Sequence, residues 1–226
     1  MTNTLAFDVY GTLIDTNGVV VALQEMIGNQ AAEFSRVWRE KQLEYTFRRG
    51  LMQRYRSFSV CTRDALNFTC AALNIDLGMK DKQRLMDSYG VLPAFSDVVK
   101  ALDGLKTADY RLYAFSNGKA DAVKALLDHA GILDHFIDVI SVDEIQTFKP
   151  DPAVYFHLLK RCNSAPESSW LISGNAFDVI GAKSAGLKGI WLKRTAAAVF
   201  DPWEGFAPDA SIPALTELDE AIRKSG

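Results

Sequence analysis

The sequence is short of the features that mark secreted, membrane-spanning and disulfide-stabilised proteins. It has three cysteines among 226 residues, and none of them forms a C-x-x-C pair. An odd number of cysteines without such a motif predicts reduced thiols in a cytosolic protein. No basic N-terminal region leads into an apolar signal core, and no apolar run approaches about 18 residues, so we expect neither secretion nor membrane insertion.

Positive charge is also scarce. The 25 lysines and arginines are outnumbered by 28 aspartates and glutamates, which leaves a net charge of −3 and no long basic stretch. The densest basic segment, residues 48–56, is typical of a solvated helix face. We therefore expect no nucleic-acid partner.

What the sequence does contain is an alternation of short apolar runs with segments of helical spacing. Four of these runs predict strands, at residues 110–115, 137–141, 169–173 and 188–192. The segments between them repeat apolar residues every three or four positions, which predicts helices. This alternation favours an α/β fold in which a doubly wound parallel sheet is covered by helices on both faces.

One part of the chain breaks the alternation. Residues 15–92 show only helical spacing, including an apolar ladder at every fourth position that runs through Leu43, Phe47, Leu51 and Tyr55. We expect residues 15–92 to form a helical cap subdomain inserted after the first strand, and residues 1–14 and 93–226 to form the core domain. An insertion at that point would hang over the sheet edge where open α/β folds bind ligands.

Polar residues follow each predicted strand at that edge. The first apolar run ends in Asp8, and the chain then turns at Gly11. A carboxylate aimed from the end of a buried strand can act as a nucleophile and form an ester with its substrate, although a lone aspartate at a strand end is better explained as a turn cap. The later strands are followed by further polar side chains: Ser116, Asn117, Lys149, Ser173, Asn175 and Asp178.

Taken in order, these residues resemble the motifs of the haloacid dehalogenase superfamily, and most closely those of its L-2-haloacid dehalogenases. The resemblance covers nearly the whole chain, and its motifs are residues 8–12, 38–45, 115–118, 148–150 with Tyr155, and 173–178. Residues 38–45 are the most diagnostic, because phosphatases of the superfamily have no such sequence there. The resemblance implies a Rossmann-like core with a helical cap, and a cytoplasmic homodimer that hydrolyses carbon–halide bonds without a metal or other cofactor.

A phosphatase is the alternative activity in this superfamily. It needs a second aspartate two residues after the nucleophile as general acid, and acidic residues in the last motif to hold Mg²⁺. Here Tyr10 stands at the first of these positions, and Gly174 and Asn175 stand where a Gly-Asp pair would supply a metal ligand. A halide leaves as a stable anion and needs no proton, so these replacements are compatible with dehalogenation.

On this basis we expect Asp8 to attack C2 of a short L-2-haloalkanoate with inversion, and water to hydrolyse the aspartyl ester to a D-2-hydroxy acid. Arg39 is expected to accept the halide, and Ser116 and Asn117 to bind the substrate carboxylate. The other expected catalytic residues orient Asp8 or activate the hydrolytic water: Thr12, Lys149, Tyr155, Ser173, Asn175 and Asp178. The expected pocket wall consists of Tyr10, Leu43, Phe58 and Phe177.

Several of these side chains also have an ordinary structural explanation. An arginine such as Arg39 on an apolar helix face can extend its charged end to water. Ser116 and Asn117 can cap the next helix, and Asp178 is favoured by the dipole at a helix start. Tyr155 either bonds the lysine or the nucleophile, or is a core residue.

Three positions depart from the family pattern, which more often has Gln at Glu40, Ser at Gly174 and Trp at Phe177. A carboxylate near the pocket would repel an anionic substrate, unless Glu40 points away, pairs with a neighbouring arginine or marks a different substrate. The sequence therefore predicts that Glu40→Gln lowers KM for 2-chloropropionate, whereas an unchanged KM would show that Glu40 faces elsewhere. Phe177 is smaller than the tryptophan of the family pattern, so we expect a different preferred chain length of the substrate.

Overall fold

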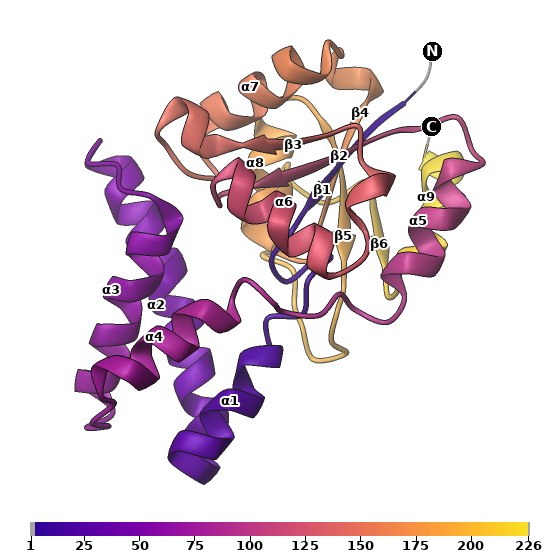
Figure 1. Cartoon of the computed structure of the whole chain (residues 1–226). Coiled ribbons are helices and arrows are strands. Elements are labelled where there is room, and N and C mark those ends of the chain that lie inside the picture. Colours follow the sequence, from indigo (N-terminus) through magenta and orange to yellow (C-terminus); the bar gives the residue numbers. More distant parts are fainter. Residues whose placement is uncertain (1–2, 226) are drawn as a thin grey trace.

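The structure, a computed structural model, describes residues 3–225 and consists of an α/β core with a helical insertion (Figure 1). The core contains a parallel sheet of six strands in the order β3-β2-β1-β4-β5-β6. The strands are β1 (Thr4–Asp8), β2 (Arg111–Ser116), β3 (Asp138–Ser141), β4 (Ser169–Ser173), β5 (Lys188–Leu192) and β6 (Ala210–Ile212). The expected doubly wound parallel sheet is confirmed.

Side chains of β1 alternate between two hydrophobic cores, one on each face of the sheet. Leu5 and Phe7 pack into the core that also contains helices α5 (Val98–Lys106), α6 (Ala120–His129) and α9 (Leu218–Ser225). Ala6 packs into the core formed with α7 (Pro152–Cys162) and α8 (Ala176–Ser184). Asp8 lies two residues after Ala6 on the strand, so its side chain points to the same face of the sheet, toward α7 and α8.

The strand order reverses direction beside β1. The chain runs outward from β1 to β2 and β3, and then returns to place β4 on the other side of β1. The carboxyl ends of β1 and β4 therefore flank the point where an open α/β sheet forms its ligand crevice. Asp8 ends β1 and Ser173 ends β4, so the topology brings these two polar residues to that crevice.

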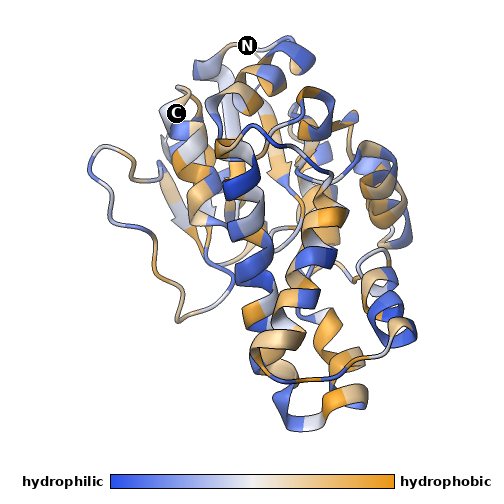
Figure 2. Ribbon diagram, turned by 90° about the vertical axis from the view of Figure 1, so that its left-hand side faces the viewer, coloured by the Kyte–Doolittle hydropathy of each residue, from blue (hydrophilic) through white to orange (hydrophobic). Residues whose placement is uncertain are grey.

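Four helices occupy the chain between β1 and α5, and Figure 1 shows them set apart from the sheet and its covering helices. They are α1 (Gly18–Ile27), α2 (Ala31–Leu51), α3 (Phe58–Ala72) and α4 (Met79–Ser88). Helices α2 and α3 pack together, and the indole nitrogen of Trp38 donates across their interface to the carbonyl oxygen of Thr62 at 2.8 Å. Hydrophobic and hydrophilic residues are interleaved along the helices (Figure 2), as expected for elements that bury one face.

The buried face of α2 differs from the predicted apolar ladder. Leu51 is 87% exposed, and Tyr55 lies beyond the end of the helix, so the ladder prediction is wrong for its second half. The residues that α2 does bury include Trp38, Gln42 and Thr46. Two of these are polar, and a search for apolar spacing therefore misses this face.

The four strands predicted after the insertion lie within one residue of β2, β3, β4 and β5. Strand β6 and helix α9 were not predicted. Strand β6 has three residues at the edge of the sheet and buries only Ile212, which is too short an apolar signal to identify from sequence. Within residues 3–225 no helix is both long enough and apolar enough to cross a membrane.

Candidate active site

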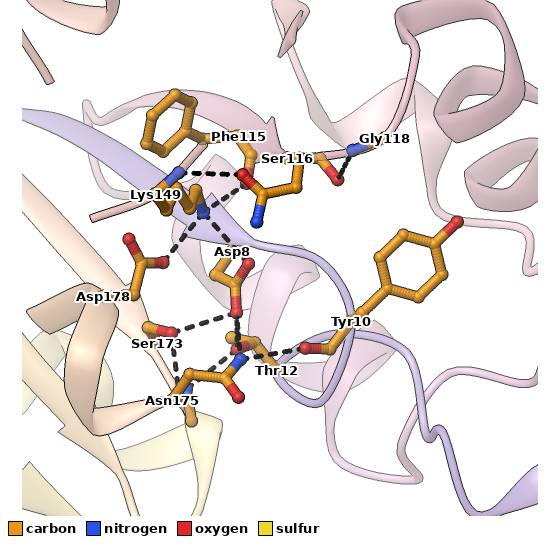
Figure 3. A network of polar contacts seen from close by, with 12 residues as sticks. Asp8, Tyr10, Thr12, Phe115, Ser116, Gly118, Lys149, Ser173, Asn175 and Asp178 are labelled. Carbon is orange, nitrogen blue, oxygen red and sulfur yellow. Dashed lines mark hydrogen bonds and ion pairs between the residues drawn. The ribbon is translucent and has the colours of Figure 1, made fainter. Parts of the chain in front are cut away.

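The Asp8 carboxylate has an asymmetric set of hydrogen bonds at the end of β1 (Figure 3). Its Oδ2 accepts three of them: from Thr12 Oγ1 at 2.8 Å, Ser173 Oγ at 3.0 Å and Asn175 Nδ2 at 2.7 Å. Within residues 3–225, its Oδ1 accepts only from Lys149 Nζ, at 3.0 Å. Oδ1 is therefore the oxygen whose lone pairs remain open to a substrate.

Lys149 uses all three of its donor positions inside the protein. Its Nζ donates to Asp8 Oδ1, to the carbonyl oxygen of Phe115 at 2.9 Å and to Asp178 Oδ2 at 2.8 Å. The side chain is 1% exposed. Burial opposes its charge, but Asp178 and Asp8 outweigh that effect and hold the pKa of Lys149 above its ordinary value. The lysine therefore stays charged between the two carboxylates.

The two carboxylates have pKa values shifted in opposite directions. Burial on its own raises the pKa of Asp8, but Lys149 and the hydrogen bonds outweigh it and hold this pKa below its ordinary value. Burial raises the pKa of Asp178 to about 6, with Lys149 opposing the rise and Asp8 adding to it. At neutral pH Asp8 is thus an anion, as a nucleophile must be, while Asp178 can exchange a proton near neutrality.

Tyr155 holds Asp178 in place. Its hydroxyl lies 2.7 Å from Asp178 Oδ1 and 3.0 Å from the carbonyl oxygen of the same residue. The contact depends on Gly181, because a Cβ added there would stand 2.4 Å from the Tyr155 hydroxyl oxygen. The core alternative for Tyr155 is therefore confirmed, since the residue is fully buried. A bond to Lys149 or Asp8 is not formed, because the carboxylate of Asp178 stands between the tyrosine and the lysine.

The turn after β1 is tied to the turn after β4. Thr12 Oγ1 donates to Asp8 and accepts a hydrogen bond from the backbone N of Gly174 at 2.8 Å. Gly11 has a φ of +80°, a left-handed conformation that glycine adopts freely. A Cβ on Gly174 would lie 2.3 Å from the carbonyl oxygen of Gly11. A serine at position 174 would therefore force the two turns apart.

Ser116 and Asn117 organise the loop after β2. Ser116 Oγ accepts from the backbone N of Gly118 at 3.1 Å, and Asn117 Oδ1 accepts from the backbone N of Lys149 at 3.0 Å. Helix α6 begins at Ala120, so neither residue is its N-cap, and the capping explanation is wrong. Asn117 ties the β2 loop to the lysine loop, and its amide nitrogen, which bonds no group among residues 3–225, remains a donor for a ligand.

Arg39 approaches the same region from α2. The groups near its guanidinium that bear on its pKa are Tyr89, Asp8 and Tyr10. Burial lowers the pKa of the guanidinium, and these three groups oppose the shift. An arginine stays protonated under such conditions. Its Nη1 donates to Gln42 Oε1 at 2.6 Å, so Arg39 presents a positive charge close to Asp8.

Part of the expected pocket wall can be located. The rings of Tyr10 and Phe58 lie 5.6 Å apart, and both line a cavity of about 370 Å³ between the insertion and the core. Phe177 packs edge-on against Phe47 of α2, with ring centres 5.1 Å apart. Leu43 is half-buried on the same helix. The contacts of Phe177 and Leu43 with a substrate stay a prediction.

Glu40 is directed away from the Asp8 site. Its side chain is 62% exposed and forms an ion pair with Arg36 at 2.8 Å. Glu40 follows Arg39 directly on α2, and consecutive helical side chains point about 100° apart. The expected repulsion between Glu40 and an anionic substrate is therefore removed by its direction and by the neighbouring arginine.

Three residues of the site were not identified from the sequence. Gln42 lies within the diagnostic stretch 38–45, where a buried glutamine could have been recognised among charged neighbours. Tyr89 lies in the segment 15–92, for which the sequence predicts helical spacing but no role in the site. The importance of Gly181 arises from a contact with Tyr155 that exists only in three dimensions.

Comparisons with known proteins agree with this geometry. A family model for haloacid dehalogenase-like hydrolases matches residues 2–186. The (S)-2-haloacid dehalogenase of Pseudomonas sp. (strain YL) is 40% identical over 220 residues, which cover 96% of this chain and 94% of that protein. The structure of L-2-haloacid dehalogenase from Xanthobacter autotrophicus has a TM-score of 0.89 and 31% identity, with 99% of both chains covered.

The structure of the Xanthobacter enzyme with chloropropionic acid covalently bound is equally similar, with a TM-score of 0.88 at 31% identity over 99% of both chains. The matching family model, the full-length identity and the shared fold lead to one conclusion. This chain belongs to the haloacid dehalogenase superfamily and, within it, to the L-2-haloacid dehalogenase family.

Proposed function

We propose that this protein is an (S)-2-haloacid dehalogenase, which hydrolyses short L-2-haloalkanoates to D-2-hydroxy acids and halide through an ester on Asp8. The observation that carries the proposal is the arrangement around its carboxylate, with three donors on Oδ2 and one on Oδ1. The substrate class is supported by the relatives, which are 2-haloacid dehalogenases, and by the covalently bound chloropropionic acid in the Xanthobacter structure.

In the first step Oδ1 of Asp8 attacks C2 of the substrate in line with the carbon–halogen bond. The new C–O bond forms as the halogen leaves with the bonding electrons, and the configuration at C2 inverts. Arg39 supplies the positive charge that receives the departing halide. A preorganised donor of this kind lowers a barrier by roughly 3–4 kcal/mol. Lys149 keeps Asp8 ionised before the attack.

In the second step water attacks the ester carbonyl carbon of Asp8. Negative charge then develops on Oδ2, to which Thr12, Ser173 and Asn175 already donate. These three donors therefore serve as the oxyanion hole. Asp178 takes a proton from the water and passes it to the departing hydroxy-acid oxygen, and the second water proton is released as the Asp8 carboxylate re-forms. Tyr155 holds the base in position.

The substrate carboxylate binds beside Ser116 and Asn117 in this scheme. The amide nitrogen of Asn117 is the available donor, because its oxygen is engaged by the backbone of Lys149. Tyr10, Leu43, Phe58 and Phe177 form the surrounding wall. An apolar wall removes water from the nucleophile and excludes unproductive hydrolysis.

The phosphatase alternative conflicts with two contacts. Asn175 Nδ2 lies 2.7 Å from Asp8 Oδ2 and 3.0 Å from the carbonyl oxygen of Tyr10. A Mg²⁺ ion bridging these two oxygens would occupy the space of the amide group. Tyr10 stands where the general acid is needed, and burial raises its pKa to about 12, too high for effective proton donation to a leaving alcohol.

We further propose that residues 15–92 act as the cap subdomain, with residues 1–14 and 93–226 as the core domain. The boundaries are supported by the positions of β1, α1 and α5. We also propose a cytoplasmic homodimer. The dimer is supported by two exposed apolar side chains of the insertion, Leu51 at 87% and Met79 at 90% exposure. Sedimentation equilibrium would report twice the chain mass for a dimer, and a monomer mass at micromolar concentration would contradict it.

The activity is tested by halide release from (S)- and (R)-2-chloropropionate in the presence of EDTA. We expect release from the (S)-enantiomer only, with (R)-lactate as the organic product and no effect of the chelator. Asp8→Asn serves as the inactive control. A phosphatase would instead release phosphate from an aryl phosphate only when Mg²⁺ is present, and that result without halide release would overturn the proposal.

A further inference from the structure

Two polar side chains in the α2–α3 interface lie outside the reaction scheme. Gln42 is 0% exposed and Thr62 is 2% exposed. Buried polar groups are unfavourable unless they are hydrogen-bonded, and these two are joined in a continuous chain. Arg39 Nη1 donates to Gln42 Oε1 at 2.6 Å, Gln42 Nε2 lies 2.6 Å from Thr62 Oγ1, and Thr62 Oγ1 lies 2.9 Å from the carbonyl oxygen of Phe58.

The direction of each hydrogen bond in the series from Arg39 to Phe58 is determined. The carbonyl oxygen of Phe58 can only accept, so the Thr62 hydroxyl must give its proton to it. The Thr62 oxygen must then accept from its other neighbour, which requires the NH₂ group of Gln42 on that side. The amide oxygen of Gln42 consequently faces Arg39, which can only donate. The opposite amide orientation would set donors against donors at the arginine end.

A neutral acceptor has a particular consequence for the half-buried Arg39. A carboxylate at the position of Gln42 would hold the guanidinium but would also cancel its charge. Gln42 holds the guanidinium without cancelling its charge, because an amide is neutral. A guanidinium has five N–H donors, and Gln42 engages only one of its nitrogens. The others remain for an incoming anion.

We propose that Gln42 and Thr62 are positioning residues, which form a one-way hydrogen-bond relay that orients the Arg39 guanidinium toward the departing halide while preserving its charge. The inference rests on the proposed function, because it assigns a role to residues that act through the halide acceptor. Ester formation depends on this relay. Ester hydrolysis does not, since the halide has left before the second step begins.

Thr62→Val tests the relay, because it removes the hydroxyl and keeps the shape of the side chain. Without the hydroxyl, the NH₂ group of Gln42 loses its buried acceptor, and the amide is no longer held at both ends in its position against Arg39. We expect the single-turnover rate of ester formation to fall roughly tenfold, as for a weakened hydrogen bond to a charged group. The loss should be larger for 2-chloropropionate than for 2-bromopropionate, because chloride is the poorer leaving group. Thr62→Ser restores the hydroxyl and should restore the rate.

Thr69→Val is the matched control. Thr69 lies on the same helix, is 0% exposed, and donates to the carbonyl oxygen of Ala65 at 2.8 Å, four residues back like Thr62. It has no contact with the relay. Both variants lose one buried hydroxyl bonded to its own helix, so a general effect on the cap would appear in both. We expect only Thr62→Val to change the ratio of bromo- to chloro-substrate rates.

Gln42→Glu provides a second, independent measurement, which decides the question if Thr62→Val does not fold. The introduced carboxylate would pair with Arg39 and reduce its attraction for anions. We expect bromide, used as a product inhibitor, to bind roughly tenfold more weakly than to the wild-type enzyme. Unchanged bromide inhibition in this variant would contradict a relay that preserves the charge of Arg39.

The relay is wrong if Thr62→Val and Thr69→Val give the same ester-formation rates. It is also wrong if Thr62→Val slows both steps equally and leaves the bromo-to-chloro ratio unchanged, which would indicate a purely structural role. Arg39→Lys separates this failure from a failure of the proposed function. If Arg39→Lys itself leaves the ratio unchanged, Arg39 is not the halide acceptor. If it shifts the ratio and Thr62→Val does not, only the relay fails.

Discussion

The side-chain amide nitrogen of Asn175 lies 2.7 Å from Oδ2 of Asp8 and donates a hydrogen bond to it. The second proton of the same nitrogen is directed to the carbonyl oxygen of Tyr10, at 3.0 Å. A neutral amide thus links the nucleophile to the backbone of Tyr10. The pair of contacts joins the turn after β1 to the turn after β4, so it also fixes the geometry of the carboxylate.

Asn175→Asp replaces this donor with a second carboxylate beside Asp8. Two adjacent carboxylates resist simultaneous ionisation, so the pKa of Asp8 should rise. The oxyanion hole also loses one donor, which typically lowers a rate roughly 100- to 1000-fold. We expect kcat/KM to fall by that factor. Asn67→Asp is the control, because Asn67 is exposed and its side-chain oxygen accepts from Lys82. Wild-type kcat/KM in Asn175→Asp would contradict this role.

The raised pKa of Asp178 predicts a pH dependence that affects only the second step. Asp178 must be deprotonated to accept a proton from water, and its pKa is about 6. The rate of ester hydrolysis should therefore fall about tenfold per pH unit below 6 and level off above it. The pKa of Asp8 lies below its ordinary value, so ester formation should stay constant over the same range. Rapid-quench kinetics from pH 5 to 8 separate the steps. A flat profile for hydrolysis would exclude Asp178 as the base.

Gly181→Ala should impair the enzyme through Tyr155. The added Cβ would stand 2.4 Å from the Tyr155 hydroxyl oxygen and 2.7 Å from Cβ of Pro150, so the tyrosine must shift away from Asp178. We expect slower ester hydrolysis with little change in ester formation, and accumulation of the ester, detected by mass spectrometry.

The control for this variant is Gly104→Ala on α5. Gly104 is exposed in the last turn of this helix, and a Cβ there meets no atom within 4 Å. This substitution should leave both steps unchanged and raise the free energy of unfolding by about 0.5–1 kcal/mol. If Gly181→Ala behaves like Gly104→Ala in both steps, the contact between Tyr155 and Asp178 does not limit hydrolysis.

Glu40→Gln should leave KM for 2-chloropropionate unchanged. The sequence predicts a lower KM, but the carboxylate is largely exposed and paired with Arg36. Exposed ion pairs contribute little, so the stability should also change by less than about 1 kcal/mol. Steady-state kinetics at two salt concentrations check this expectation. A clear decrease in KM would mean that Glu40 influences the pocket after all.

Much of the fold was predictable because the relevant signals are local. Strands β4 and β5 are continuous apolar runs with polar ends, and they match the prediction residue for residue. The helical insertion was predictable for the same reason, since its spacing differs from that of the core. Strand β6 and the polar buried face of α2 were not, because their burial is decided by distant neighbours rather than by an apolar pattern.

Which residues form the site was more predictable than which atoms they contact. A parallel sheet gathers its strand ends at one edge, so Asp8, Lys149 and Asp178 were expected together. Which oxygen each donor contacts depends on side-chain directions that the sequence does not encode locally. That is why Asp178, the partner of Tyr155, is not among the partners that the sequence predicts for this tyrosine, and why the sequence leaves the direction of Glu40 open.

The most direct test of the account follows the oxygen atom of the product. A single turnover of (S)-2-chloropropionate is run in ¹⁸O water with enzyme in excess, and the lactate and the peptide that contains Asp8 are analysed by mass spectrometry. Because water attacks the ester carbonyl, the isotope should appear in the Asp8 carboxylate and the lactate should be unlabelled. Label in the lactate, with none in Asp8, would mean that water displaces the halide itself and that Asp8 is not the nucleophile.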